Sequence, residues 1–171
     1  FNFHQGALGC AIRAGSPTLN HLVVTSRQVA AHSGRSVILV CPALFNPENL
    51  GSLIRLGDVM GAAGLVVGPG CPDPLSRRVT RVSMGTSLAF PVVETTNLAA
   101  ALDELADPGD HLLAATVCEP VGPSSLKPGA VVEPFDQVPW PDRVALLFGT
   151  EAHGLESRWI HRADQLTTIV M

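Results

Sequence analysis

Two short polar segments carry the side chains whose types and spacing are best suited to chemistry. In the first, an asparagine, Asn49, is followed six residues later by an arginine, Arg55; the second is Gly149 to Glu151. The first begins soon after an apolar run that ends at Cys41, and the second directly follows a run that ends at Phe148. The carboxyl ends of parallel strands meet at one edge of an α/β sheet, where such folds bind ligands. The two segments therefore predict a shared ligand site.

The elements that must position these segments are short, β-branched apolar runs. Such runs predict buried strands at residues 36–41, 64–67, 90–93, 111–117, 143–148 and 166–170. Helical spacing or capping signals lie between most of them, an alternation typical of a sheet covered on both faces. We predict an α/β fold with a mostly parallel sheet and helices on both faces.

The helices are predicted from caps and breakers. One covers residues 19–31, a second is capped by Asn49 and ends at Gly61, and a third is capped by Asp73 and stops at Gly85. Further helices are expected over residues 97–106 and from near 154 toward 161. Residues 119–141 hold six prolines and predict a long surface connection.

Arg55 lies off the apolar face that Leu50 and Ile54 give to the second helix. A simple alternative is an exposed ion pair with Asp58 at i+3, worth about 0.3 kcal/mol. Three more arginines, Arg77, Arg78 and Arg81, belong to the third helix, where Arg77 and Arg81 point away from the core. We weigh phosphate contact by these three and an ordinary solvated face about equally.

Composition limits the classes of function. Apolar residues make up 46% and charged residues 15%, which favours one packed domain over a disordered chain. With no tyrosine and 5% aromatic residues, the composition argues against a base-stacking platform, because such sites line up several rings, so any nucleic-acid contact should depend on other chemistry. A net charge of −4 gives no overall basic footprint, so RNA binding needs a local patch or a partner surface. We find no GxGxxG, P-loop or GxSxG motif.

The four cysteines lack metal-ligand spacing, so we expect free thiols and no metal. No apolar stretch reaches the roughly 20 residues of a membrane span. We therefore expect no membrane partner and a reducing, cytoplasmic location.

Three segments together resemble the SpoU/TrmH family of the SPOUT superfamily. They are residues 49–55, NLGSLIR; residues 73–78 and 81–85, DPLSRR and RVSMG; and residues 148–155, FGTEAHGL. Order and spacing match over about residues 45–171. The resemblance implies a C-terminal trefoil knot that binds S-adenosylmethionine (SAM), and a homodimer that methylates the ribose 2′-hydroxyl of tRNA or rRNA.

The resemblance also implies roles for residues. Arg55 would engage the target ribose and its phosphate, Asn49 would hold the loop and the partner subunit, and Glu151 would order the loops around the cofactor. Backbone groups of Thr116, Gly149, Ile169 and Met171 would surround SAM. Since arginine rarely releases its proton, we assign Arg55 to orienting the hydroxyl and stabilising the oxyanion; the proton acceptor stays open.

The resemblance divides the chain into two parts. Residues 1–34 are expected to be a linker and first helix after an N-terminal RNA-binding domain, and residues 35–171 a catalytic domain truncated before the third motif, which leaves the knot incomplete. Glu156 and Val170 depart from the family pattern. They suggest as an alternative a non-catalytic RNA-binding SPOUT-like protein that has lost cofactor use. A less favoured alternative is an unrelated nucleotide-binding α/β module.

Overall fold

Most of the strands form on the short apolar runs of the sequence. In the computed structural model, which describes residues 12–13, 15–106, 110–116, 132–150 and 153–168, seven strands make one sheet in the order β3-β2-β1-β6-β4-β7-β5. Every pairing is parallel. The strands are β1 (Ser36–Cys41), β2 (Gly64–Val67), β3 (Val92–Glu94), β4 (His111–Thr116), β5 (Val132–Pro134), β6 (Arg143–Leu147) and β7 (Gln165–Thr168).

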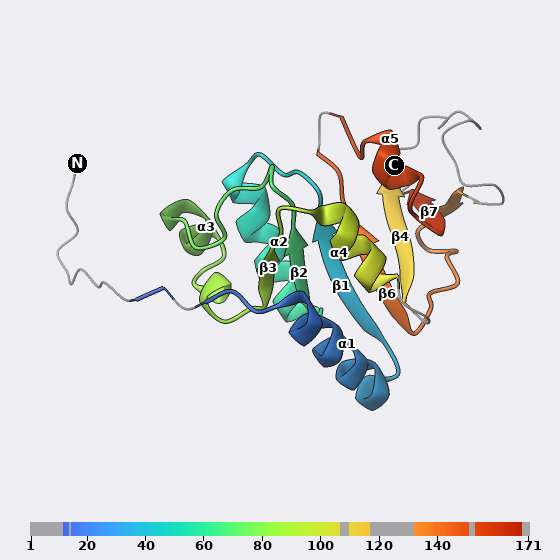
Figure 1. Cartoon of the computed structure of the whole chain (residues 1–171), viewed down its shortest axis with the longest axis horizontal. Helices are drawn as coiled ribbons and strands as arrows, with labels where there is room; N and C mark the ends of the chain where they lie inside the picture. Colours follow the sequence, from blue (N-terminus) through green and yellow to red (C-terminus); the bar gives the residue numbers. More distant parts are fainter. Residues whose placement is uncertain (1–11, 14, 107–109, 117–131, 151–152, 169–171) are drawn as a thin grey trace.

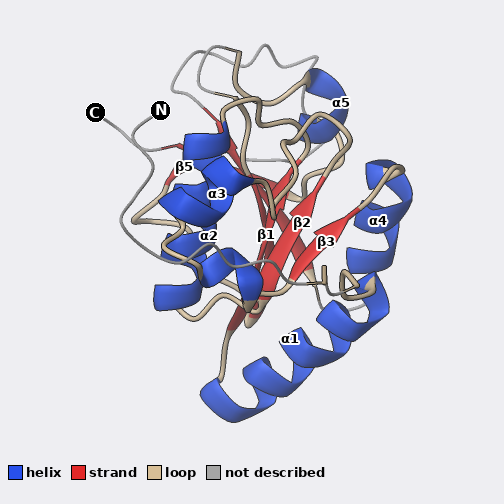
Figure 2. Ribbon diagram, turned by 90° about the vertical axis from the view of Figure 1, so that its left-hand side faces the viewer, coloured by secondary structure: helices blue, strands red, loops and turns tan. Residues whose placement is uncertain are grey.

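Helices cover both faces of this sheet, as predicted (Figures 1 and 2). One face packs against α1 (Leu19–Ser33), α4 (Leu98–Leu105) and α5 (Ser157–Ile160), which contribute Leu22, Leu102 and Trp159 to one apolar cluster. The other packs against α2 (Pro47–Val59) and α3 (Arg77–Val82), which contribute Ile54 and Val79 to a second cluster. The α/β fold class is therefore confirmed.

The start of α2 differs from the prediction. The cap is Asn46, whose side-chain oxygen accepts a hydrogen bond from the Glu48 amide at 2.8 Å, and Pro47 occupies the first helical position. Asn49 is thus a half-buried residue of the first turn, and the assignment of Asn49 as the cap was wrong. The apolar face is as predicted, because Leu50 and Ile54 are fully buried.

Two other helix starts were also wrong, and one strand was missed. The carboxylate of Asp73 closes a local turn on the Leu75 amide, and α3 begins only after Ser76, which caps it. The last helix, α5, is a single short turn that starts at Ser157 rather than near residue 154. The proline-rich connection contains the short strand β5 at the edge of the sheet.

The chain order creates a topological switch point between β1 and β6. These neighbouring parallel strands are followed by helices on opposite faces, since α2 packs in one apolar cluster and α5 in the other. Diverging helices leave a crevice outside the carboxyl ends of the two strands, the usual ligand position in such sheets. The predicted knot depends on residues after Thr168, which lie outside the described ranges, and it stays a prediction.

Candidate functional site

A crevice of about 200 Å³ lies at the switch point. One wall is the connection from β1 to α2, and the other is the connection from β6 to α5 (Figure 1). The β6–α5 connection brings Gly149 and Thr150 of the second motif to the crevice, whereas residues 49–55 of the first motif belong to α2 and none of them lines it. The lining residues are Pro42, Ala43, Phe45, Gly149, Thr150, His153, Gly154, Leu155, Glu156 and Trp159.

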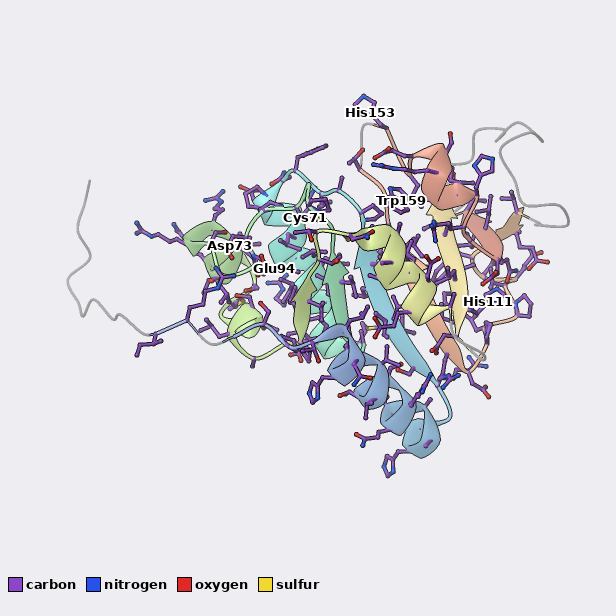
Figure 3. The ribbon with its side chains drawn as sticks, viewed as in Figure 1. Cys71, Asp73, Glu94, His111, His153 and Trp159 are labelled. Carbon is purple, nitrogen blue, oxygen red and sulfur yellow. The ribbon has the colours of Figure 1, made fainter. Side chains whose placement is uncertain are left out.

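The loop after β6 folds back tightly on itself. Thr150 and Gly154 exchange two backbone hydrogen bonds of 2.8 and 3.0 Å, and Gly154 has a φ of 63°. A Cβ atom on Gly149 would lie only 2.0 Å from the carbonyl carbon of Gly154, so no side chain fits there. Figure 3 shows His153 at the outer end of this loop. Glu151 lies outside the described residues.

Arg55 lies on the solvent side of α2, as expected, but does not line the crevice. Its Nη1 donates to the sulfur of Met84 at 3.5 Å, and within the described ranges it makes no ion pair with Asp58. Met84 is a left-handed residue with φ of 56°. Asn49 is six residues before Arg55 in the same helix, which places it about 9 Å from Arg55 along the axis. Neither residue lines the crevice.

Of the predicted cofactor positions, Gly149 lines the crevice and Thr116 ends β4, the strand next to β6. Thr116 ends β4 and is in register with Thr168, which ends β7. The Thr168 hydroxyl is buried and has no hydrogen-bond partner in the described part of the chain. An unsatisfied buried hydroxyl favours a polar ligand at this edge. Ile169 and Met171 lie outside the described residues.

The arginines of α3 differ in their surroundings. Arg77, Arg78 and Arg81 are all exposed, but Arg78 forms an ion pair with Glu48 of α2. Arg77 and Arg81 have no acidic partner among the described residues. These two guanidinium groups are therefore available to an anion.

Acidic side chains nearby are neutralised by Arg13, which sequence reasoning did not identify. Its guanidinium donates to Asp73 at 2.8 Å and to Glu94 at 2.7 Å, and the hydrogen bond and charge of Asp73, with a smaller effect of Glu94, raise the pKa of Arg13. Residues this far apart in the chain give no local sequence signal. The result is an N-terminal segment held across the outer edge of the sheet.

Two thiols lie near the loops of the site. Cys41 is buried and Cys71 half-buried, both are free, and the Cys71 thiol donates to the Cys41 carbonyl at 3.3 Å. Burial raises the pKa of both thiols. Within the ranges that the structure describes, no group of three or more His, Cys, Asp or Glu side chains is arranged to hold a metal ion. Likewise, none of the described helices is long and apolar enough to cross a membrane.

Comparison with known proteins gives consistent matches. Over 171 residues the chain is 32% identical to an uncharacterised tRNA/rRNA methyltransferase of Mycobacterium bovis and spans 54% of its length. It is 29% identical over 132 residues to the 23S rRNA (guanosine(2553)-2′-O)-methyltransferase RlmP of Bacillus subtilis, which is 77% of this chain and 48% of that protein. The chain thus spans about half the length of these curated relatives.

The fold is similar to that of an AdoMet-bound rRNA methyltransferase from Sinorhizobium meliloti. The TM-score is 0.64 at 23% identity, over 81% of this chain and 48% of that one. Residues 36–171 match the profile of the SpoU rRNA Methylase family. This match, over most of the chain, shows that the chain belongs to the SpoU rRNA Methylase family.

Proposed function

We propose that this protein transfers the methyl group of SAM to a ribose 2′-hydroxyl of structured tRNA or rRNA. The observation that carries the proposal is that the second motif lines a crevice at the switch point between β1 and β6, while the first motif belongs to α2, the helix that begins beside that crevice. A ribose hydroxyl is a poor nucleophile, so transfer needs alignment with the methyl donor and stabilisation of the developing oxyanion. The residues of α2 and of the β6–α5 loop are suited to these two tasks.

Arg55 is the proposed catalytic residue. Its guanidinium is solvent-exposed and makes no described ion pair, so its donors can turn from the Met84 sulfur to a ribose oxygen and its phosphate. Because a neutral thioether is a weak acceptor, this exchange gives up little. Asn49, in the first turn of the same helix, is proposed to hold the loop and the partner subunit, and Glu151 to order the cofactor loop.

The strand ends beside the crevice fit SAM. When bound, SAM supplies an electrophilic methyl group on a sulfonium. The backbone at Gly149 approaches its neighbours too closely for a side chain, and the unsatisfied Thr168 hydroxyl offers a buried polar contact. Together with Thr116, Ile169 and Met171, these groups are proposed to hold the adenosine and methionine parts of SAM. No step of the proposal requires a metal ion.

RNA contact is proposed to use Arg77 and Arg81, with Arg78 as a third cation. The charge of the whole chain, −4, opposes the approach of RNA, so contact must come from local cations. Two of the three have no described acidic partner, while releasing Arg78 requires breaking its pair with Glu48. We expect Arg78 to contribute least.

A homodimer is proposed for a separate reason. The C-terminal half of α2, with the residue that caps it, exposes three large apolar side chains, Leu56, Val59 and Met60. Contiguous exposed apolar residues on one helix are typical of interfaces. Because Arg55 is next to this patch, a partner copy seated there would lie close to the active site. The reduced thiols fit the proposed cytoplasmic location.

The proposal is tested by incubating the full-length protein with tritiated SAM and with unmodified transcripts of bulk bacterial tRNA and rRNA. We expect label in RNA that survives alkaline hydrolysis as a dinucleotide, because a 2′-O-methyl group blocks cleavage of the adjacent phosphodiester. Label on a base, or no transfer, contradicts it. Calorimetric titration with SAM separates the non-catalytic alternative, which predicts RNA binding without SAM affinity.

A further inference from the structure

Phe45 is an exposed aromatic ring at the rim of the crevice. It directly precedes the cap of α2, a position from which an apolar side chain usually packs onto the residue four places into the helix. That residue is Leu50, which is fully buried by the core. Phe45 is nevertheless 72% exposed, so most of its ring contributes nothing to packing the helix start. The structure gives this ring no folding role.

The ring is also held in place. The Asn46 cap and Pro47 restrict the backbone that follows it. On the other side, the ring atom Cε1 is 3.7 Å from the point where a side chain on Gly70 would begin, so the ring lies over the β2–α3 connection. A ring with one edge supported and its surface open loses little entropy when it binds a flat ligand.

We propose that Phe45 is a stacking platform for one unpaired base of the RNA substrate, at the mouth of the crevice. Bases stack on single aromatic side chains when a nucleotide is turned out of its helix. The ring rests on the connection that leads to α3, whose Arg77 and Arg81 supply positive charge for the phosphates. The low aromatic content argues against a platform of several rings, but a single ring in a fixed position is compatible with it. This inference rests on the proposed RNA substrate.

The test compares Phe45→Ala with Leu88→Ala in the full-length protein. Leu88, on the 3₁₀ helix Thr86–Leu88, is 71% exposed and does not line the crevice, so it controls for loss of an exposed apolar side chain. Phe45→Ala should lower kcat/KM for bulk tRNA or rRNA by roughly 5- to 150-fold, since stacking contributes that much per base. The Kd for SAM should not change. Phe45→Trp should restore activity, and RNA should quench its added fluorescence.

Three results overturn the inference. RNA kinetics of Phe45→Ala equal to those of Leu88→Ala would show that the ring does not contact RNA. Dissociation of Phe45→Ala in sedimentation would place the ring in a protein interface instead. Fluorescence of Phe45→Trp that RNA leaves unchanged would place the base elsewhere. Methyl transfer by the wild-type protein is the control for each result. If the wild type transfers no methyl group to RNA, the proposed function is wrong. If the wild type is active, only the role of Phe45 is wrong.

Discussion

Replacing Gly149 by alanine tests whether the loop after β6 is as constrained as its geometry indicates. The added Cβ would lie 2.0 Å from the Gly154 carbonyl carbon and 2.3 Å from the Leu155 nitrogen, against a practical minimum of 3.0 Å. The obstacle is the backbone of the Gly154–Leu155 peptide, so a rotamer change cannot relieve it. The Thr150–Gly154 pair, with its hydrogen bonds of 2.8 and 3.0 Å, must open.

The size of the effect follows from these contacts. Overpacking costs about 1–3 kcal/mol, and each lost backbone hydrogen bond costs about 0.5–1.5 kcal/mol. With part of the clash relieved by opening the loop, we expect Gly149→Ala to lower the free energy of unfolding by about 2–4 kcal/mol. Because the loop forms one wall of the crevice, SAM affinity should fall as well.

Urea denaturation and calorimetric titration with SAM measure these two effects. Gly15→Ala is the matched control, because a Cβ on Gly15 meets nothing within 4 Å. It should leave both quantities unchanged. If Gly149→Ala unfolds at the same urea concentration as Gly15→Ala and binds SAM as tightly, the argument that a close backbone approach shapes this loop is wrong.

Two further predictions concern stability. Arg143→Ala removes one partner of a 2.9 Å ion pair in which Asp110 is only 7% exposed, and it should lower the free energy of unfolding by about 2–4 kcal/mol in urea denaturation. Arg158→Ala, which removes an exposed ion pair, should lower it by less than about 1 kcal/mol. Equal losses for the two variants would contradict the argument from burial. Because burial raises the pKa of Cys41, the folded state keeps a proton that the unfolded state releases above its own thiol pKa. Stability should therefore fall as pH rises from 8 to 10, by up to about 1.4 kcal/mol per pH unit. Cys41→Ala should flatten this fall, and an unchanged slope would exclude the thiol as its cause.

Most of the strands were predictable because they form on apolar runs of the sequence. Strands β1 and β2 begin and end where the sequence predicts, and β6 ends one residue early. The missed strand, β5, is three residues long, ends in proline and pairs on one side only, so it carries neither alternation nor a buried run. Its pairing with β7 is a tertiary effect.

Helix starts were harder because several residues compete for each cap. Asn46 and Asn49 are both suitable, and Pro47 decides between them since it favours the first helical position. Asp73 with Pro74 resembles a helix start but forms an isolated turn, and Ser76 caps the helix. Such choices depend on which turn the surrounding loops can accommodate.

The site was predictable in its location but not in its contacts. Parallel topology places the connections that follow β1 and β6 at one edge, and this could be read from the strand pattern. The contact of Arg55 with Met84 could not, because it depends on a left-handed backbone at Met84 and on the packing of α3 against α2. The exposure of Phe45 likewise depends on how α2 begins.

Methyl transfer by an Arg55→Ala variant is the most direct test of the central claim. The matched control is Arg35→Ala, an exposed arginine that precedes β1 at the opposite edge of the sheet. In the full-length protein, Arg55→Ala should lower kcat for transfer from SAM to RNA by at least about 100-fold, the typical effect of removing one oxyanion donor. SAM affinity and the free energy of unfolding should match those of Arg35→Ala. Transfer by Arg55→Ala at the rate of Arg35→Ala would contradict the assignment of Arg55 as the catalytic residue.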